Sequence, residues 1–252
     1  MKSTNQIIAW FSCGVTSAVA CKLALQIYDN VELYYIDIGS QCRDSIRFLE
    51  ECQDWYGQKI TILTSKEYCC HFDVIEKERV IGLHNYFPCT KKLKKDVRYA
   101  LQDDMKEWGG QVWGFELGEE IRATRMLEQY PDLKSLFPLI EAQLTKENCA
   151  FILEQQGIEL PKMYKLGYNN NNCIGCVRGG MGYWNKIRVD FPNIFQRMAK
   201  LERKIGHSCL TERVNRKKIP LFLDELDPNR GSFPTEIIPE CGLFCELEFI
   251  NQ

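Results

Sequence analysis

Five cysteines are spaced so that together they could hold a metal centre. Cys173 and Cys176 put two thiols on one turn, the spacing typical of zinc or iron–sulfur ligands. Cys89 precedes a strongly basic segment, where neighbouring lysines and a helix N-terminus favour its thiolate form. Cys241 and Cys245 complete the set of five. We expect three or four of these thiolates to bind a [4Fe-4S] cluster. The two C-terminal pairs alone would close a zinc site, and spacing alone does not separate the two.

A second chemical feature lies near the N-terminus, in residues 7–25 (IIAWFSCGVTSAVACKLAL). This stretch predicts a short apolar strand, a tight Ser/Gly loop and a helix. The backbone N–H groups at the start of such a helix bind phosphate or sulfate. Ser12 and Ser17 add hydroxyl donors, and Gly14 supplies backbone freedom. An ordinary buried strand–turn–helix corner has the same local pattern.

Strands alternate with helices over most of the chain, which predicts a doubly wound, mostly parallel α/β sheet with ligands at the carboxyl ends of its strands. We expect a nucleotide-binding domain over residues 1–176. A basic, helical, cysteine-containing C-terminal extension over residues 177–252 would pack on the same domain. The segments that carry this prediction are strands near 7–10, 31–38, 59–63 and 111–115, and helices near 43–56, 89–105 and 146–155.

Composition excludes several classes of protein. The chain has 252 residues and a net charge of −2, so overall charge indicates neither a nucleic acid nor a membrane partner. No apolar run is long enough to span a membrane, and residues 1–10 lack a secretory signal. Thirteen cysteines without such a signal predict a reducing, cytoplasmic location and thiols used for metal or sulfur chemistry. Cys21 and Cys52 fall on apolar helix faces and are expected to be core residues.

One region has a strongly positive net charge, unlike the chain as a whole. Residues 186–218 hold ten lysines or arginines against three acidic residues. A docked amphipathic helix with a solvated basic face explains this pattern, and so does a surface that contacts the phosphate backbone of a nucleic acid. Both interpretations stay open.

Taken in order, these segments resemble the phosphoadenosine phosphosulfate reductase family of the PP-loop superfamily. The resemblance covers roughly residues 6–176 and returns at 239–245. The segments that resemble the family's motifs are FSCGVTSAVA, YYIDIGSQCRDSIRFLEE, PCTKKLKKDV, GFELGEEIRATR, MYKLGYNNNNCIGC and PECGLFC.

The resemblance implies an enzyme that binds an adenine nucleotide, with Cys241 as the catalytic nucleophile. The nucleotide-binding residues that it implies are Ser12, Gly14, Thr16, Ser17, Asp37, Gly39, Glu119 and Arg122. The metal ligands that it implies are Cys89, Cys173, Cys176 and Cys245, with Cys241 and Cys245 able to exchange roles. Its expected partners are a thioredoxin-like reductant and a second copy of the chain in a homodimer.

Departures from the family pattern bear on the reaction. Cys13 and Thr16 replace the second Gly and the Asp of the loop in ATP-splitting members, and losing that carboxylate removes a natural magnesium ligand. Cys89 stands alone where cluster-bearing reductases have a tandem pair, and Phe244 replaces the usual His of the catalytic motif.

Two enzymatic functions follow. In the first, Cys241 attacks the sulfur of an adenosine phosphosulfate, and a dithiol then releases sulfite. In the alternative, a PP-loop enzyme uses ATP to transfer sulfur or an adenylyl group to RNA or DNA. A non-catalytic nucleotide-binding regulator is a third interpretation. We favour the reductase.

Overall fold

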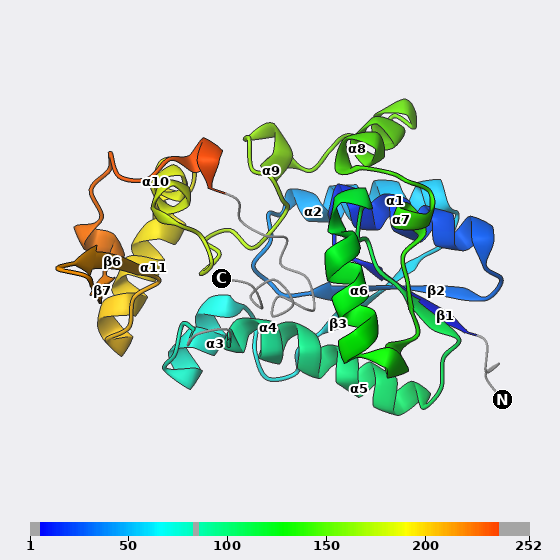
Figure 1. Ribbon diagram of the computed structural model, residues 1–252, viewed down its shortest axis with the longest axis horizontal. Helices are drawn as coiled ribbons and strands as arrows, with labels where there is room; N and C mark the ends of the chain where they lie inside the picture. The colour runs from blue at the N-terminus through cyan, green and yellow to red at the C-terminus, as the bar shows by residue number, and fades with distance from the viewer. Residues whose placement is uncertain (1–5, 83–85, 237–252) are drawn as a thin grey trace.

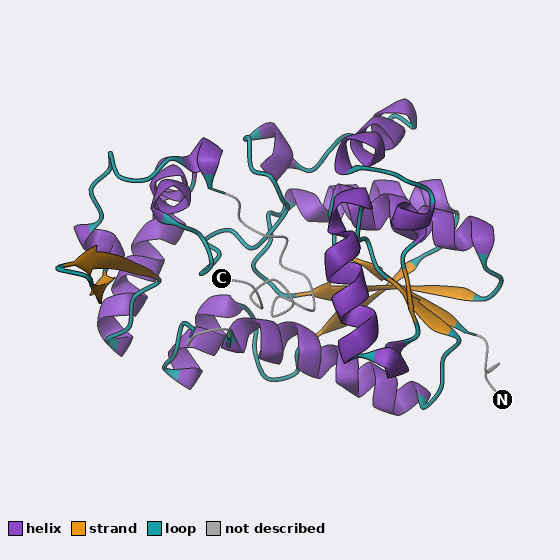
Figure 2. Ribbon diagram, viewed as in Figure 1, coloured by secondary structure: helices purple, strands orange, loops and turns teal. Residues whose placement is uncertain are grey.

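A parallel sheet at the centre of the molecule is covered by helices on both faces (Figures 1 and 2). The computed structural model describes residues 6–82 and 86–236. Its five strands lie in the order β3-β2-β1-β4-β5, and every neighbouring pair is parallel. The strands are β1 (Ile7–Phe11), β2 (Val31–Asp37), β3 (Ile60–Thr64), β4 (Gly110–Val112) and β5 (Ser135–Leu136). The predicted doubly wound α/β fold is confirmed.

Burial of the central strands explains their composition. All five residues of β1 are buried, because helices cover the sheet on both sides. One core lies beneath α1 (Val15–Ile27), α2 (Asp44–Tyr56) and α8 (Lys146–Gln155). The other core is formed with residues of α3 (His71–Glu78), α4 (Pro88–Thr90), α5 (Asp96–Met105), α6 (Glu120–Gln129), α10 (Met181–Asp190) and α11 (Pro192–Ile205).

The chain order creates a crevice at one edge of this sheet. From β1 the chain runs outward through β2 to β3, whereas β4 and β5 lie on the other side of β1. The connections that follow β1 and β4 therefore diverge, which opens a binding crevice at the carboxyl ends of these strands. The loop that holds the predicted anion site follows β1 directly, so the fold places this loop at the crevice.

The basic segment after Cys89 forms one continuous helical stretch in three parts. Between α4 and α5, residues Lys91–Lys95 form a π-helix. Such wider turns are rare in α-helices and occur often at functional sites. This turn buries Leu93 in the core, leaves Lys91 exposed and places Lys94 in the wall of the cavity described below.

The C-terminal extension contains helices, as predicted, and also a hairpin that sequence reasoning missed. Figure 1 shows α10, α11 and the strands β6 (Leu210–Val214) and β7 (Lys217–Leu221) grouped beside the sheet domain. Asn215 and Arg216 join the two strands, both with positive φ, as a two-residue hairpin turn requires. Two short helices, α7 (Pro138–Glu141) and α9 (Lys162–Lys165), complete the chain order. Within the described ranges, no helix has the length and hydropathy of a membrane span.

Candidate functional site

The anion loop, residues 12–17, is held in shape by its own serines. Ser17 Oγ donates to the Gly14 carbonyl at 2.9 Å and accepts from the Ser12 backbone N–H at 3.0 Å. It also accepts from Ser12 Oγ at 2.9 Å. The first amides of α1 have no partner within the helix, so the loop presents N–H groups at the positive end of the helix dipole. This is the geometry of an anion site.

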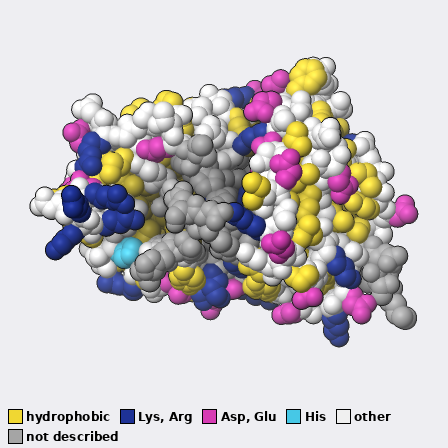
Figure 3. All heavy atoms as spheres, viewed as in Figure 1, with side chains coloured by type: hydrophobic (Ala, Val, Ile, Leu, Met, Phe, Trp, Pro, Cys, Tyr) yellow, Lys and Arg dark blue, Asp and Glu magenta, His cyan; other side chains and the backbone are white. Residues whose placement is uncertain are grey.

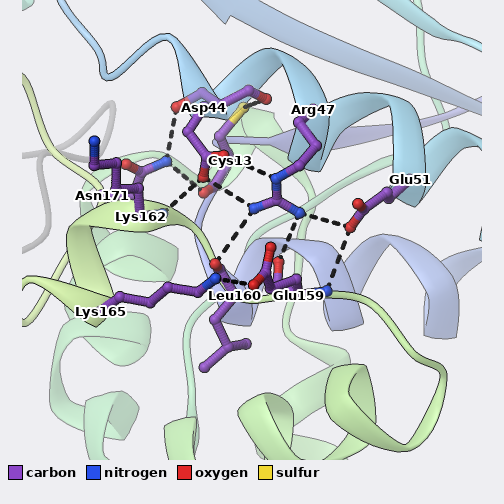
Figure 4. A network of polar contacts seen from close by, with 10 residues as sticks. Cys13, Asp44, Arg47, Glu51, Glu159, Leu160, Lys162, Lys165 and Asn171 are labelled. Carbon is purple, nitrogen blue, oxygen red and sulfur yellow. Dashed lines mark hydrogen bonds and ion pairs between the residues drawn. The ribbon is translucent and has the colours of Figure 1, made fainter.

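The strained residue of the loop is Cys13, not the glycine that we expected. Cys13 has φ +60°, whereas Gly14 is extended with φ −97°. A non-glycine residue adopts such a conformation only where its surroundings hold it. Here the Asn171 side-chain amide donates to the Cys13 carbonyl and to Ser45 Oγ, both at 2.9 Å (Figure 4).

A second set of contacts anchors the segment that carries Asn171. Figure 4 shows the Arg47 guanidinium of α2 between acidic side chains and the backbone that precedes α9. Arg47 pairs with Asp44 at 2.8 Å and with Glu51 at 2.7 Å, and donates to the Glu159 carbonyl at 3.0 Å. Arg47 holds the pKa of Asp44 below its usual value. The shape of the anion loop therefore depends on a distant part of the chain.

A large cavity of about 90 Å³ lies at the crevice between β1 and β4. Its wall combines the anion loop with aromatic side chains, two cations and one thiol. No aspartate or glutamate lines it among the residues that the structure describes. The lining residues are Trp10, Phe11, Ser12, Gly14, Ser17, Ile36, Ile38, Gln41, Lys94, Trp113, Gly114, Phe115, Arg122, Asn171, Asn172 and Cys173.

Arg122 enters this cavity in a fixed orientation. Its guanidinium lies 4.3 Å from the centre of the Phe115 ring and pairs with Glu119 at 2.6 Å. Glu119 itself does not line the cavity, and its second oxygen accepts from the Glu116 backbone at 3.1 Å. The structure therefore places Arg122 at the site and Glu119 behind it.

The other nucleotide-binding residues that the sequence predicted lie near the cavity without lining it. Thr16 is buried at the start of α1. Asp37 Oδ1 accepts from the Gly39 backbone N–H at 2.8 Å, so both residues shape the turn after β2.

A second, smaller cavity is lined by three of the four predicted metal ligands. We call it the thiol cavity, and it is lined by His71, Phe87, Cys89, Thr90, Cys173, Cys176, Val177 and Arg178. Cys173 lines both cavities, so the thiols adjoin the anion loop. Cys241 and Cys245 lie outside the described residues. Over the described ranges, no three His, Cys, Asp or Glu side chains converge as tightly as a single metal ion requires.

The turn that carries Cys173 and Cys176 is fixed by one buried hydroxyl. Tyr183 Oη accepts from the backbone N–H groups of Gly175 at 3.0 Å and Cys176 at 2.9 Å. It donates to the Cys173 carbonyl at 3.1 Å. Tyr183 belongs to α10, so the extension holds the cysteine turn in place.

We expect Tyr183→Phe to lower the free energy of unfolding by roughly 2–5 kcal/mol, because two buried N–H groups lose their acceptor. Urea denaturation of the metal-free protein measures this change. Tyr56→Phe is the control, because the buried Tyr56 hydroxyl donates to Ala18 O at 2.7 Å and contacts the Cys52 thiol but accepts from no backbone N–H in the described part of the chain, so its loss should cost about 1 kcal/mol. Equal losses in the two variants would contradict the role given to Tyr183.

His71 is a site residue that sequence reasoning missed. Its side chain is buried, and its Nδ1 lies 2.7 Å from Ser40 Oγ. Burial, with a smaller contribution from Arg197, lowers the pKa of His71 to about 4, although a hydrogen bond with the Gly175 backbone acts in the opposite direction. The ring is therefore neutral at pH 7 and lies against the turn between Cys173 and Cys176.

Several cysteines away from the two cavities are buried among core residues or contact a buried carboxylate. Cys21 and Cys52 are fully buried in the core beneath α1 and α2, as predicted, and burial raises the pKa of each thiol, that of Cys52 to about 12. Burial likewise raises the pKa of Cys209, whose thiol interacts with the buried Glu202 carboxylate. The tandem pair Cys69 and Cys70 does not line the thiol cavity.

Much of the basic charge in residues 186–218 is used within the protein. Arg203 pairs with Asp224 and Glu225, and Lys186 pairs with Asp190 at 2.9 Å. The cations that remain exposed on the β6–β7 hairpin are Arg213, Arg216, Lys217 and Lys218. Lysines and arginines gather on this side of the molecule in Figure 3. The predicted amphipathic helix is α11, which buries Phe195, Met198 and Leu201, and contact with a nucleic acid stays a prediction.

Known proteins match this chain over the sheet domain and the cysteine turn. Residues 6–179 match the model of the phosphoadenosine phosphosulfate reductase domain family. The structure is similar to a phosphoadenylyl-sulfate (PAPS) reductase from Candida auris, solved as a phosphate complex, with a TM-score of 0.52 and 12% identity. This similarity covers 67% of this chain and 81% of that one.

Three further proteins are similar to this chain. The U34-tRNA thiolase NcsA from Methanococcus maripaludis, solved with its [4Fe-4S] cluster, has a TM-score of 0.43 and 14% identity, covering 82% of this chain and 74% of that one. The uncharacterized proteins MJ0066 and MJ0973 from Methanocaldococcus jannaschii are 22% and 20% identical over 81% and 78% of this chain. The chain spans 42% and 47% of their lengths, less than half of each. The match to the family model covers most of the chain, which therefore belongs to the phosphoadenosine phosphosulfate reductase family.

Proposed function

We propose that this protein is a sulfonucleotide reductase that binds an adenosine phosphosulfate in the large cavity. One observation carries the proposal: the cavity joins an anion loop to two cations and a cysteine thiol, with no carboxylate from the described residues. A magnesium–ATP site usually holds its metal through one or two carboxylates together with the phosphates. A phosphosulfate needs only donors and cations, which Ser17, Lys94 and Arg122 supply.

Different groups in the cavity wall would bind different parts of the nucleotide. The aromatic residues offer an apolar surface for the adenine ring, with Trp10 and Trp113 stacked at a centroid distance of 6.0 Å. The anion loop binds the phosphate, and Lys94 and Arg122 reduce the negative charge that repels an incoming thiolate.

The reaction that we propose proceeds in two steps. The Cys241 thiolate attacks the sulfur of the phosphosulfate, and the bond from that sulfur to the phosphate oxygen breaks, so the adenosine phosphate leaves with the electron pair. A thioredoxin-like dithiol then attacks Cys241 Sγ and releases sulfite. The second thiol of the dithiol resolves the mixed disulfide, which leaves the reductant oxidised and Cys241 free.

Cys89, Cys173 and Cys176 would hold a [4Fe-4S] cluster beside this cavity. Zinc binds thiolates at about 2.3 Å, so its ligand atoms must converge on one point. A cluster binds each thiolate at a separate iron and accepts wider spacing. When bound, the cluster would supply a charged centre next to the substrate's sulfonate.

The experiment offers adenosine 5′-phosphosulfate, its 3′-phosphorylated form and ATP to the anaerobically purified protein with a dithiol. We expect sulfite from one or both phosphosulfates, no pyrophosphate from ATP, and loss of sulfite release in Cys241→Ser. Sulfite release that survives in Cys241→Ser would contradict the assignment of the nucleophile. Pyrophosphate from ATP without any sulfite would contradict the reductase.

A second candidate function is sulfur or adenylyl transfer to a nucleic acid. The observation that favours it is the exposed basic face of the β6–β7 hairpin, which has the charge that phosphate backbones require. This function predicts RNA or DNA binding that weakens with salt and with Lys217→Ala and Lys218→Ala together. Unchanged affinity in this double variant would exclude the hairpin as the nucleic-acid interface.

A further inference from the structure

One peptide group of the anion loop is held by a side chain from outside the loop. The Asn171 amide nitrogen donates to the Cys13 carbonyl and to Ser45 Oγ, both at 2.9 Å. A carbonyl oxygen only accepts, so the contact with Cys13 fixes which end of the Asn171 amide faces it. The Cys13 thiol also contacts the Ser45 carbonyl at 3.7 Å, and all three residues are buried. The loop, α2 and the segment before the cysteine turn therefore meet at Cys13.

Cys13 needs this support because of its backbone conformation. Its φ of +60° lies in the left-handed region, where a residue with a Cβ is disfavoured roughly five- to thirty-fold. Glycine adopts the same conformation freely. Without a partner for its carbonyl, Cys13 would return to negative φ, and this rotation would turn the peptide group that follows it.

The peptide group between Cys13 and Gly14 has an acceptor at one end and a donor at the other. Because the group is planar and trans, its C=O and N–H point in opposite directions. Asn171 holds the C=O, so the Gly14 N–H points away from Asn171. Gly14 lines the large cavity together with Ser12 and Ser17, which places this N–H among the donors of the anion site. A turned peptide would instead present a carbonyl oxygen, which repels an anion.

We propose that Asn171 is a positioning residue for nucleotide binding, which aims the Gly14 N–H at the bound phosphate by holding the Cys13 carbonyl. Asn171 lies two residues before Cys173, so the segment that carries the cysteine turn also contributes to the affinity of the anion loop. The inference rests on the nucleotide binding of the proposed function and not on its reaction.

Calorimetric titration with adenosine 5′-monophosphate (AMP) measures this effect in the metal-free protein. We expect Asn171→Ala to weaken binding roughly tenfold, because Cys13 is then no longer held in its disfavoured conformation. Asn171→Asp should weaken binding at least as much, since an ionised carboxylate of the same size cannot donate to a carbonyl. Asn169→Ala is the matched control and should bind AMP as the wild type does, because Asn169 is exposed and does not line the large cavity.

A second substitution separates positioning from general stability. Glycine at position 13 adopts positive φ without the support of Asn171, so Asn171→Ala should weaken binding less than about threefold when Cys13→Gly is also present. The comparison is between the two backgrounds, because Cys13→Gly changes the loop itself. If Asn171 only stabilised the fold, its loss would have the same effect on affinity in both backgrounds.

A measurement on the wild type removes dependence on variants that fail to fold. Cysteine is followed by glycine at two places in the sequence, residues 13–14 and 241–242. Cysteine labelled with ¹³C at its carbonyl and glycine labelled with ¹⁵N therefore give two signals in a spectrum that correlates each amide with the preceding carbonyl. Cys241→Ser identifies the second signal. We expect the Gly14 signal to shift when AMP binds, because its N–H gains a charged acceptor.

The role of Asn171 would be overturned by wild-type affinity in Asn171→Ala, by equal weakening in both backgrounds, or by a Gly14 signal that does not move when AMP binds. A protein that meets these expectations and releases no sulfite would contradict the proposed reaction alone. A wild type that binds no AMP would contradict nucleotide binding in the large cavity, and this inference with it.

Discussion

Gly39→Ala is expected to lower the free energy of unfolding by roughly 2–5 kcal/mol. Gly39 has φ +61°, a conformation that costs other residues about 1–2 kcal/mol. A Cβ at this position would also lie 2.0 Å from the Cys69 carbonyl oxygen, which is backbone and cannot rotate away. The turn after β2 or the segment before α3 must therefore move, which adds an overpacking cost of about 1–3 kcal/mol.

Urea denaturation of both variants separates these two contributions. Gly57→Ala is the matched control, because Gly57 has φ +69° and a Cβ there meets nothing within 4 Å. It should cost only the conformational part, about 1 kcal/mol. Equal destabilisation by both variants would show that the contact with Cys69 is unimportant.

Gly114→Ala is expected to weaken nucleotide binding by at least tenfold. Gly114 follows β4, and a Cβ on it would lie 2.8 Å from both the backbone nitrogen and the Cα of Ser17. The anion loop would have to shift away from β4, which displaces the amide and hydroxyl that face the large cavity. A comparable overpacking costs about 1–3 kcal/mol, and a loss of 1.4 kcal/mol in binding alone is tenfold.

Calorimetric titration with adenosine 5′-phosphosulfate measures this effect in the metal-free protein. Gly118→Ala is the control, because the nearest atom to its added Cβ is a flexible carboxylate oxygen of Glu116 at 3.4 Å. We expect affinity to be retained in Gly118→Ala. Wild-type affinity in Gly114→Ala would mean that the anion loop does not bind the nucleotide.

Sequence patterns predicted the parts of the site that depend on local structure. A short, contiguous segment encodes the strand, loop and helix around Ser17. Another encodes the turn between Cys173 and Cys176. Parallel strands bring their carboxyl ends to one edge of the sheet. A pattern of alternating strands and helices could therefore indicate that the Ser17 loop and the cysteine turn lie close together. The helix from Lys146 to Gln155 was predicted with its observed ends, because Thr145 and Asn148 form a capping box there.

The parts that sequence reasoning missed depend on contacts between distant segments. Tyr183 fixes the cysteine turn through hydrogen bonds with three backbone groups of another segment. The His71 ring contacts Ser40, which lies thirty-one residues earlier in the chain. Neither side chain belongs to a recognisable motif. The β6–β7 hairpin had a local signal, since Asn215 and Arg216 form its turn, but the surrounding lysines and arginines resembled a basic helical surface. The conformation of Cys13 depends on Asn171 and could not be inferred from the loop alone.

Cys173 belongs to the walls of both cavities, and this shared residue has a thermodynamic consequence. Any nucleotide that displaces Cys173 on binding changes the affinity of the metal centre for the protein. By reciprocity, the metal centre changes the affinity for that nucleotide by the same factor. Substrate occupancy and the integrity of the metal centre are then coupled equilibria, and each can be followed by observing the other.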